Sequence, residues 1–329
     1  MTDCSLSFTI PVYNGAQTIL ETLESVQSEC DSNCEIVVLD NCSTDATAQI
    51  VEDFQSKYTH VRYFRNSENL GYDRNFNRCF EEAVGDYVWI VGDDDLIRPG
   101  AVEKVREVLA EHDDLGFIYV NYAIVNRATN KISKERDYTV YEDRLFSPGS
   151  EAALLLQEYP NFISSLVFDR AAWLRANAEQ YFDTLYSQYG VFLDVTTQQK
   201  SYCVAEPYVE NKCRINNLEH KPGFYRNYLA NFISLLTLID DHQSLEHDKN
   251  SRQQIIAGMF ARHFLKYVKV HKLMGGEFRK EHALTLWGFV RTNPSHLPTF
   301  LLYLIPGTVL RLAQGLRVSM RQKLSGKKV

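Results

Sequence analysis

The sequence predicts a three-layer α/β fold around a mostly parallel sheet, followed by a helical C-terminal region. Through residues 6–91, short apolar runs alternate with segments whose apolar residues recur at helical spacing. Polar residues collect directly after each apolar run, which is typical of parallel strands that end at one edge of a sheet. From about residue 223 onward, the apolar spacing is helical.

The elements of the sheet are expected from the apolar runs and the turn residues between them. The expected order is strand 6–14 with a turn at Asn14-Gly15, helix 17–28, strand 34–39, helix 46–58, strand 61–64, helix 72–83 and strand 87–91. Thr44 or Asp45 can cap the second helix. This alternation should bring the ends of the strands to one crevice.

Composition restricts the class of protein. The 329 residues suffice for two domains or for one large domain with an appendage. A formal net charge of −7 argues against a general nucleic-acid-binding protein. The seven cysteines are odd in number and form no Cys-x-x-Cys pair, and Met1-Thr2-Asp3 does not begin a secretory leader. These features predict reduced thiols in a cytosolic protein.

Three consecutive carboxylates follow the buried strand 87–91. Gly92 allows the backbone to turn, and Asp93, Asp94 and Asp95 then lie at the carboxyl end of the strand. Carboxylates this close repel one another unless a positive group lies among them, and Mg²⁺ or Mn²⁺ bound to a substrate diphosphate is the natural candidate. The alternative is that Asp94 or Asp95 only caps a helix that begins near Gly100.

Other nucleotide-binding classes are disfavoured by the motifs that this sequence lacks. Neither a Gly-x-Gly-x-x-Gly sequence after the first strand nor a Gly-x-x-x-x-Gly-Lys-Ser/Thr sequence occurs. The chain is therefore expected to bind a nucleotide without a glycine-rich phosphate loop.

Four motifs occur in one order between Leu6 and Gly100: Ile10-Pro11-Val12-Tyr13-Asn14, Asp40-Asn41-Cys42-Ser43-Thr44-Asp45, Asn69-Leu70-Gly71 with Arg74-Asn75, and Gly92-Asp93-Asp94-Asp95. Together they resemble a family 2 glycosyltransferase of the GT-A fold. The resemblance is greatest to the bacterial branch that adds sugars to cell-surface polysaccharides, including abequosyltransferase-like members. It is weak beyond Tyr122.

The resemblance implies a role for each matching position. The donor nucleotide would be bound by Pro11, Tyr13, Asn14, Asp40, Asn69, Gly71, Arg74, Asp93 and Asp94. Within this set, Asp40 would accept a hydrogen bond from the base, Arg74 would neutralise the diphosphate, and Asp93 would lie near the ribose. Asp95 would be the direct metal ligand, with Asp93 as a second.

Simpler interpretations stand beside these roles. Tyr13-Asn14 is compatible with an ordinary turn, and residues 41–45 with an ordinary capped loop. Arg74 can also pair with Glu81 or Glu82 on a solvated helix face.

The resemblance also implies a catalytic base late in the α/β domain, after a short strand and a Phe-Asp segment, often in a Glu-Asp pair at a helix start. Residues 164–168 match the strand, residues 181–183 the Phe-Asp segment, and residues 190–194 the helix start. Asp194 is the first choice for the base and Asp183 the second. Leu193 precedes Asp194, so the usual pair is missing. The alternative is that Asp194 caps a helix or lies on the surface.

Two further site residues follow the expected strand 202–209. Arg214 lies in the segment 212–217, where members of the family often order a loop over the diphosphate, and His220 would be a third metal ligand. Either one can instead be an ordinary surface or structural residue. The polar segment 122–147 is expected to be an exposed hairpin or insertion.

The C-terminal sequence predicts contact with a membrane surface. Residues 297–310 carry no charge, and the six basic residues that follow them have no acidic neighbours: Arg311, Arg317, Arg321, Lys323, Lys327 and Lys328. Fourteen residues are fewer than the roughly 20 that span a bilayer, so an interfacial helix is expected. The alternative is a tail that packs on a partner subunit.

These observations predict a catalytic domain over residues 1–212, with the donor side in 1–100 and the acceptor side in 101–212. A helical region is expected over 213–296 and an amphipathic basic tail over 297–329. The expected function is metal-dependent, inverting transfer of a sugar from a UDP-, GDP-, CDP- or dTDP-linked donor to a glycan, or lipid-linked glycan, at the inner face of the cell membrane. A homo-oligomer is compatible with the helical region. The alternative is a non-catalytic relative that binds a nucleotide sugar or scaffolds a polysaccharide assembly complex. A nucleotidyltransferase is disfavoured because its glycine- and arginine-rich amino-terminal loop is absent.

Overall fold

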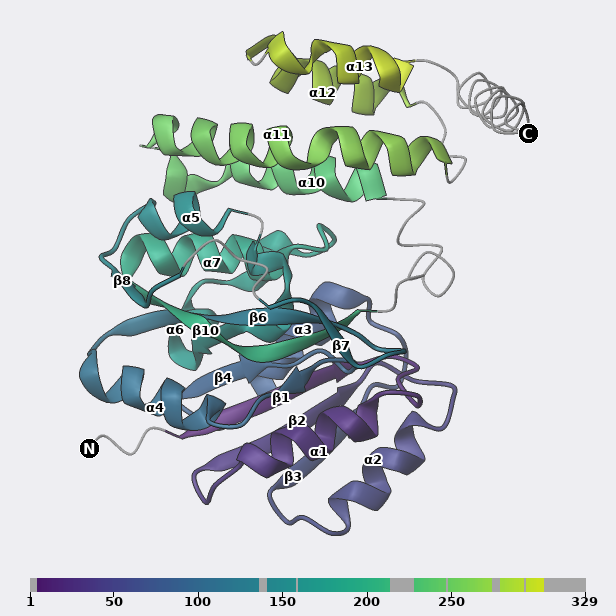
Figure 1. The fold of residues 1–329 in the computed structure, drawn as a ribbon, viewed down its shortest axis with the longest axis vertical. Coiled ribbons are helices and arrows are strands. Elements are labelled where there is room, and N and C mark those ends of the chain that lie inside the picture. Colours follow the sequence, from purple (N-terminus) through teal and green to yellow (C-terminus); the bar gives the residue numbers. More distant parts are fainter. Residues whose placement is uncertain are drawn as a thin grey trace, which may run out of the picture. The chain divides into compact units, whose positions relative to one another are not determined.

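The computed structural model describes residues 5–135, 141–157, 159–213, 228–246, 248–273, 279–292 and 294–304. The chain divides into two compact units (Figure 1). The first unit comprises Met1–Ile215 with His242–Ser251, and the second comprises Asn216–Asp241 with Arg252–Val329.

The first unit is built on one mixed sheet. Its strands are β1 (Leu6–Val12), β2 (Cys34–Asp40), β3 (Val61–Arg65), β4 (Tyr87–Ile90), β5 (Leu96–Ile97), β6 (Leu115–Asn126), β7 (Lys131–Lys134), β8 (Arg144–Phe146), β9 (Leu166–Asp169) and β10 (Lys200–Cys213). Their order is β3-β2-β1-β4-β9-β6-β10-β5, with β7 paired to β6 and β8 to β10. The strands β1, β2, β3, β4, β6 and β10 all run in one direction, because β9 pairs antiparallel with both β4 and β6. Their carboxyl ends therefore meet at one edge.

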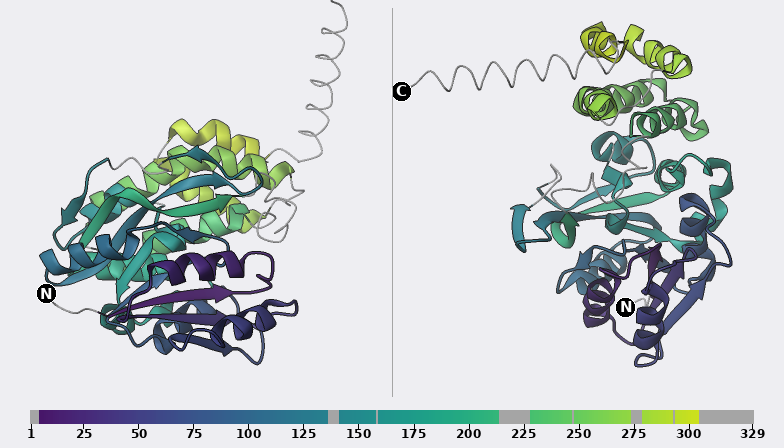
Figure 2. Two further views of the ribbon diagram at one scale, coloured as in Figure 1. Left: turned by 60° about the horizontal axis from the view of Figure 1, so that its bottom comes forward. Right: turned by 90° about the vertical axis from the view of Figure 1, so that its right-hand side faces the viewer.

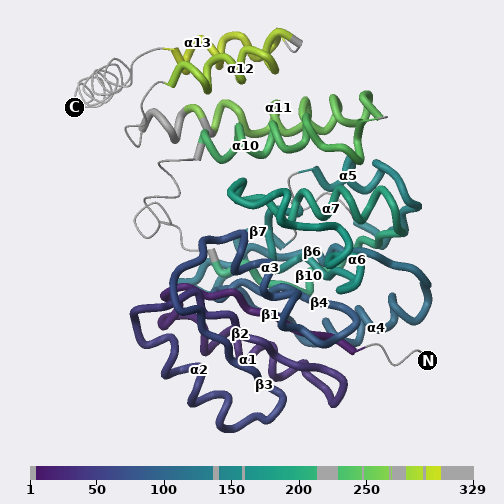
Figure 3. The backbone as a smooth tube through the Cα atoms, turned by 180° about the vertical axis from the view of Figure 1, so that it is seen from behind, coloured from purple at the N-terminus to yellow at the C-terminus, as the bar shows by residue number. Residues whose placement is uncertain are grey.

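Helices cover both faces of this sheet (Figures 2 and 3). The helices of the first unit are α1 (Ile19–Glu29), α2 (Thr47–Gln55), α3 (Tyr72–Glu82), α4 (Ala101–Glu111), α5 (Glu151–Leu156), α6 (Arg170–Arg175) and α7 (Ser187–Gln198). Because helices shield both faces, the central strands β2 and β4 are buried along their whole length, and their sequences are accordingly almost continuously apolar. Phe80 of α3 stacks on Trp173 of α6 with ring centroids 3.7 Å apart, which joins two helices of one face.

The second unit is helical. It contains α10 (Tyr228–Asp241), most of α11 (Lys249–Leu273), α12 (Lys280–Thr292) and α13 (Leu297–Leu304). Apolar side chains at helical spacing form its core, including Phe232, Leu236, Phe260, Phe264 and Val290. Within the described ranges, every helix is too short or too polar to cross a bilayer.

The predicted β-α alternation from residue 6 to residue 91 is confirmed. Three later expectations were wrong. The buried strand β6 runs to Asn126, so the exposed hairpin starts after it rather than at Tyr122. Strand β10 extends to Cys213, beyond the expected 202–209, because it pairs with β6 again after an irregularity at Val204/Val209. Helix α7 starts at Ser187, about one turn before the expected start.

Candidate active site

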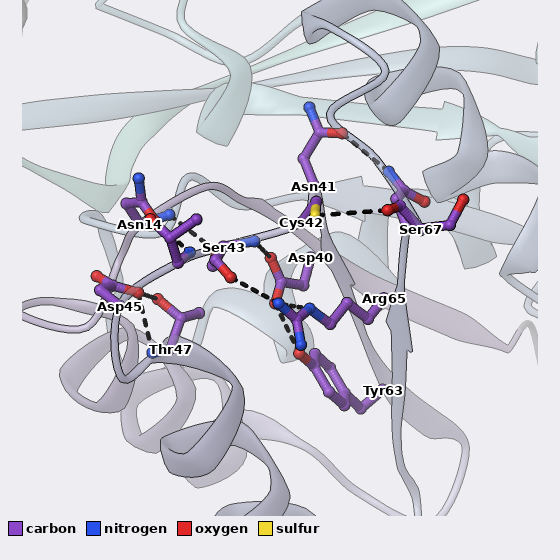
Figure 4. A network of polar contacts seen from close by, with 12 residues as sticks. Asn14, Asp40, Asn41, Cys42, Ser43, Asp45, Thr47, Tyr63, Arg65 and Ser67 are labelled. Carbon is purple, nitrogen blue, oxygen red and sulfur yellow. Dashed lines mark hydrogen bonds and ion pairs between the residues drawn. The ribbon is translucent and has the colours of Figure 1, made fainter.

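The turn after β2 is held by a polar network (Figure 4). Asp40 is fully buried and accepts hydrogen bonds from the Ser43 backbone N–H at 2.7 Å and the Tyr63 hydroxyl at 2.6 Å. The Arg65 guanidinium lies 3.7 Å from the same carboxylate and also donates to the Ser43 carbonyl. Burial and Asp40 raise the pKa of Tyr63, so its hydroxyl stays a donor. Asp40 thus fixes the shape of this turn, and its contact with a base stays a prediction.

The end of β1 is tied to the same turn. The Asn14 backbone N–H donates to Ser43 Oγ at 2.9 Å, and Asn14 Oδ1 accepts from the Thr44 N–H at 2.7 Å. Asn14 adopts a left-handed φ of 56°, which this short amide side chain tolerates. Tyr13 is left half-exposed beside it. Ala46 is the N-cap of α2, and the carboxylate of Asp45, one residue earlier, accepts from the backbone N–H and the hydroxyl of Thr47.

The ends of β2 and β3 are joined by asparagines. Asn41 is buried and donates to Asn69 Oδ1 at 3.0 Å and to the Gly71 carbonyl at 3.1 Å, while its own Oδ1 accepts from the Leu70 N–H. Gly71 has a left-handed φ of +81° immediately before α3. Asn75 adds a hydrogen bond to the Leu39 carbonyl. The Asn-x-Gly motif is therefore a rigid entry into α3.

Arg74, in the first turn of α3, forms a bidentate ion pair with Asp183. The two nitrogen–oxygen distances are 2.7 and 3.3 Å, and both side chains are largely exposed. The guanidinium also lies 5.1 Å from the centroid of the Phe182 ring. The pairing of Arg74 with Glu81 or Glu82, weighed as an alternative, was wrong. The pair instead joins the N-terminal end of α3 to the loop before α7.

Asp73 holds that loop in place. Its buried carboxylate accepts from the Leu185 N–H at 2.9 Å and from the Ser187 N–H at 3.2 Å. Asp183 and Leu185 both have a left-handed φ, of 65° and 66°. The loop therefore places Asp183 beside the carboxyl edge of the sheet, where α3 begins.

The acid triplet follows β4 at the same edge. Asp93 and Asp94 are partly exposed, whereas Asp95 is buried. Asp95 accepts from Ser164 Oγ at 2.5 Å with one carboxylate oxygen and from the Lys212 N–H at 3.3 Å with the other. Burial, and then Asp94 and Asp93, raise the pKa of Asp95.

Two positions next to the triplet in space, Gly15 and Gly92, leave no room for a side chain. A side chain at Gly15 would overlap a carboxylate oxygen of Asp93, and one at Gly92 would lie 2.9 Å from Asp95 Oδ2. Ser164, in the 3₁₀ turn Ile163–Ser165, accepts from the Gly92 N–H at 2.9 Å while donating to Asp95. Ser164 therefore links Gly92 to Asp95, the two ends of the turn that carries the acid triplet (the acid turn).

Helix α1 supports the segment after the triplet with one polar ridge. Thr22 donates to the Asp95 carbonyl at 2.9 Å, and Ser25 Oγ accepts from the Ile97 N–H at 3.2 Å. Glu29 accepts from the N–H groups of Gly100, the N-cap of α4, and Ala101, its first residue. The alternative that Asp94 or Asp95 caps this helix was wrong, because Glu29 fills that position.

Arg127 and Lys212 form a charged network next to the acid triplet. Arg127 donates to the Asp94 carbonyl and, at 3.0 Å, to Glu21 of α1. Lys212 is buried, with its ammonium 2.6 Å from Asn130 Oδ1 and 3.3 Å from Glu210. These contacts fasten the β6–β7 hairpin and the end of β10 to the acid turn.

Asp194 lies inside α7, about two turns from the helix start. Its oxygens accept from the Tyr181 hydroxyl at 2.7 Å and from Ser244 Oγ at 2.6 Å, and its side chain is 14% exposed. Tyr181 is in turn 2.8 Å from His242 Nε2. The alternative of a helix cap or a surface carboxylate was wrong for Asp194. It ties α7 to the segment 242–251.

The acid triplet suits a cation that arrives with a substrate. Among the described residues, no group of three or more His, Cys, Asp or Glu side chains is placed to hold a metal ion. Mg²⁺-type ions are commonly held by one or two carboxylates together with substrate phosphates, so the hard oxygens of Asp93 and Asp95 fit such an ion. Arg214 and His220 lie outside the described residues.

A family model matches the N-terminal part of the chain. Residues 7–166 match the family model of Glycosyl transferase family 2. The chain carries a family 2 glycosyltransferase domain. It is 28% identical over 261 residues to abequosyltransferase RfbV of Salmonella typhimurium, covering 73% of this chain and 75% of the relative. It is also 31% identical over 108 residues to the putative glycosyltransferase EpsE of Bacillus subtilis, covering 32% and 39%.

Solved glycosyltransferase structures share the fold. S. aureus TarS in complex with UDP superposes with a TM-score of 0.63 at 17% identity, covering 90% of this chain and 83% of TarS. The mannosyltransferase PcManGT from Pyrobaculum calidifontis, in complex with GDP-Man and Mn²⁺, gives a TM-score of 0.53 at 14% identity over 94% and 87% of the chains. The expected GT-A-type fold is thereby confirmed.

The sequence interpretation missed the residues that support the acid triplet of the candidate site. Ser164, Thr22 and Arg127 act through contacts between segments far apart in the chain. One signal was available, since Thr22, Ser25 and Glu29 recur at helical spacing along α1.

Proposed function

We propose that the chain is a metal-dependent, inverting glycosyltransferase that moves a sugar from a nucleotide-sugar donor to a lipid-linked glycan in the synthesis of a cell-surface polysaccharide. The motifs of β1, β2, α3 and the acid triplet lie at one edge of the sheet, where open α/β sheets bind ligands. Structural neighbours bound to UDP, UDP-GlcNAc or GDP-Man support a nucleotide-sugar donor. The abequosyltransferase relative supports the polysaccharide role.

The donor would lie along this edge. Pro11, Tyr13 and Asn14 would line the nucleoside pocket, with Asp40 near the base and Asp93 and Asp94 near the ribose. Tyr13 is half-exposed there and free to stack. Asn69 and Gly71 would shape the entry to the diphosphate, and Arg74, at the start of α3, would pair with it.

A bound Mn²⁺ or Mg²⁺ would stabilise the negative charge that grows on the departing diphosphate. Asp95 and Asp93 would hold it, with His220 as a third ligand. Arg74 and Arg214 would add positive charge at the same leaving group. Ser164 and the Lys212 N–H would keep the Asp95 carboxylate in one orientation.

For the general base, we favour Asp183 over Asp194. Both oxygens of Asp194 already accept hydrogen bonds within the fold. Asp183 is exposed at the edge where the donor motifs lie, and Arg74 holds the pKa of its carboxyl below the ordinary value, so Asp183 is ionised at neutral pH. It would accept the proton of the acceptor hydroxyl as that oxygen attacks the anomeric carbon from the face opposite the diphosphate. A single displacement of this kind inverts the anomeric centre.

Arg74 would bind Asp183 first and the donor diphosphate afterwards. In the structure it pairs with Asp183, and a donor diphosphate would compete for the same guanidinium. Release of Asp183 would raise the pKa of its carboxyl and strengthen the base once the donor is in place.

The acceptor side and the cellular location are inferred from the sequence of the C-terminal region. The uncharged residues 297–310 and the basic residues after them suit an enzyme on the inner face of the cell membrane. We therefore place the protein in the cytoplasm, peripherally associated with that membrane. The helical unit would be the surface for homo-oligomerisation. The remaining alternative for the tail is a partner subunit.

One observation favours a second candidate function, a non-catalytic subunit that binds a nucleotide sugar. Helix α7 begins with Ser187 and Gln188, so no carboxylate occupies the helix start where the resemblance places a Glu-Asp pair. If Asp183 does not act as the base, the protein would bind a nucleotide sugar at the carboxyl edge of the sheet but would not catalyse transfer.

Hydrolysis of nucleotide sugars separates the two functions. A panel of UDP-, GDP-, CDP- and dTDP-sugars would be incubated with and without Mn²⁺, and released nucleotide would be measured. The enzyme is expected to hydrolyse one donor only with the metal, and Asp95→Ala should abolish this. Asp53→Ala, an exposed α2 carboxylate that bonds only its helix neighbour Gln49 among the described residues, is the matched control and should leave the rate unchanged. Binding without turnover of any donor, with acceptor preparations present, would favour the non-catalytic subunit.

A further inference from the structure

The hairpin of α12 and α13 in the second unit carries an outward apolar face. Its members are Leu284 at 63% exposed and Trp287 at 45% on α12, and Leu297 at 38%, Leu301 at 51% and Leu304 at 41% on α13. They follow helical spacing, at i and i+3 on α12 and at i, i+4 and i+7 on α13. Each helix therefore presents one stripe to the outside. Five large apolar side chains gathered on two consecutive helices exceed the scattered single exposures that soluble surfaces ordinarily carry.

The opposite face of the hairpin already forms the core. Leu286, Val290, Phe300 and Tyr303 are buried, and the Tyr303 hydroxyl accepts from the Arg279 N–H at 3.2 Å. Trp287 lies against Phe300 with ring centroids 5.5 Å apart, so the inner packing anchors the tryptophan. These buried side chains hold the hairpin from its inner face.

Charge at the end of the hairpin indicates what covers this face. Helix α13 has no charged residue, and the sequence after Leu304 carries six basic residues and no acidic one. This contrasts with the net charge of −7 for the whole chain. A leucine- and tryptophan-rich face, followed after the uncharged residues 305–310 by basic residues, is complementary to an anionic lipid surface, where tryptophan settles at the headgroup level.

We propose that the outward face of α12 and α13 docks on an anionic bilayer surface, with Trp287 and Leu301 entering the headgroup region. This inference deepens the membrane part of the proposed function. It does not depend on donor binding or on catalysis. It adds α12 to the interface, since the sequence pattern alone had placed only residues 297–329 at the membrane.

The tryptophans of the chain make the test direct. Trp89 and Trp173 are fully buried in the first unit, whereas Trp287 is exposed. Vesicles of phosphatidylethanolamine and phosphatidylglycerol with brominated acyl chains should quench the fluorescence of the full-length protein. The same vesicles should not quench Trp287→Phe, although this variant should still sediment with them. Vesicles of phosphatidylcholine alone should bind more weakly.

Charged substitutions supply the second readout. The double variant Trp287→Glu with Leu301→Glu should weaken vesicle binding at least about tenfold, because it buries two acids against an anionic surface. Leu174→Glu, on α6 and 46% exposed, is the matched control and should bind vesicles as the wild type does. Circular dichroism and retained nucleotide binding by the double variant would show that both units are folded, and would separate this inference from the proposed catalytic function.

Three outcomes would overturn the inference. In the first, the wild type fails to bind the anionic vesicles. In the second, binding survives both charged substitutions and is removed by salt alone, which would assign it to the basic tail. In the third, the double variant changes the oligomeric mass in solution rather than vesicle binding, which would make the face an interface between two copies of the chain.

Discussion

Arg74 and Asp183 form a bidentate ion pair although 109 residues separate them in the chain. Arg74 belongs to the half of the protein that carries the donor motifs, and Asp183 belongs to the half that follows the family-matched segment. The pair brings a candidate diphosphate-binding cation and a candidate base within direct contact. It links the two sides of the proposed reaction through side chains that both reach the surface.

Asp183→Asn should abolish transfer without loss of the donor. The amide keeps the shape of the side chain but cannot accept the hydroxyl proton, so kcat should fall by about 10²- to 10⁴-fold. Nucleotide affinity should stay the same or rise, because Arg74 no longer has an anionic partner in the protein. Steady-state kinetics with calorimetric binding checks this, and a kcat close to the wild-type value would exclude Asp183 as the base.

Asp194→Asn should instead lower stability. The two oxygens of Asp194 accept from Tyr181 and Ser244, and the amide of the variant has one oxygen, so it satisfies only one of these donors. A loss of about 1–3 kcal/mol in the free energy of unfolding is expected. Urea unfolding measures it. A stable variant with kcat reduced as strongly as in Asp183→Asn would reverse the two assignments.

Ser164→Ala should weaken metal binding. The substitution removes the hydrogen bonds that orient Asp95 and fix the Gly92 N–H, and the loss of such an outer contact typically costs about 10- to 100-fold in affinity. Ser165→Ala is the control, because the Ser165 hydroxyl is equally buried but has no hydrogen-bond partner among the described residues. Mn²⁺ titration in the presence of nucleotide, followed by electron paramagnetic resonance, should separate the two variants. Equal affinities would remove Ser164 from the support of the site.

His242 should make stability depend on pH. Burial lowers the pKa of its imidazole in the folded protein, and this effect exceeds the opposing influence of Asp194, 3.8 Å away. The unfolded chain therefore binds a proton at a higher pH than the folded chain does. The contribution of His242 to the free energy of unfolding is complete above about pH 6.5. It is lost as the pH falls below this value, with a slope of up to about 1.4 kcal/mol per pH unit.

The variant His242→Gln isolates this contribution. Other groups contribute to acid destabilisation in both proteins, so the useful quantity is the loss of unfolding free energy between about pH 7.5 and about pH 5.5 in each. The wild type should lose more than the variant. An equal loss in both would mean that His242 does not titrate differently in the folded and unfolded chains.

The donor half of the fold was predictable from the sequence because its signals are local. Residues 6–91 alternate strand and helix patterns at short range, and each strand pairs in parallel with a strand of this same segment. The acid triplet was visible for the same reason, since a buried run leads directly into it. Its metal-binding role stays a prediction.

The acceptor half depends on long-range pairing that no local pattern reveals. Strand β9 inserts antiparallel between β4 and β6, joining residues 167–169 to residues 87–89. Ser164 reaches Asp95 only because of that insertion. Asp194 was chosen from its spacing after the Phe-Asp segment, but α7 begins at Ser187 because Asp73 accepts from its N–H, and this places Asp194 in the middle of the helix.

Calorimetric titration of UDP, GDP, CDP and dTDP, with and without Mn²⁺, into the wild type and Asp95→Ala tests the central claim most directly. The account predicts that one nucleotide binds, that Mn²⁺ strengthens its binding, and that the variant loses this metal effect while remaining folded. Failure of all four nucleotides to bind a well-folded wild-type protein, or metal-strengthened binding that survives Asp95→Ala, would contradict it.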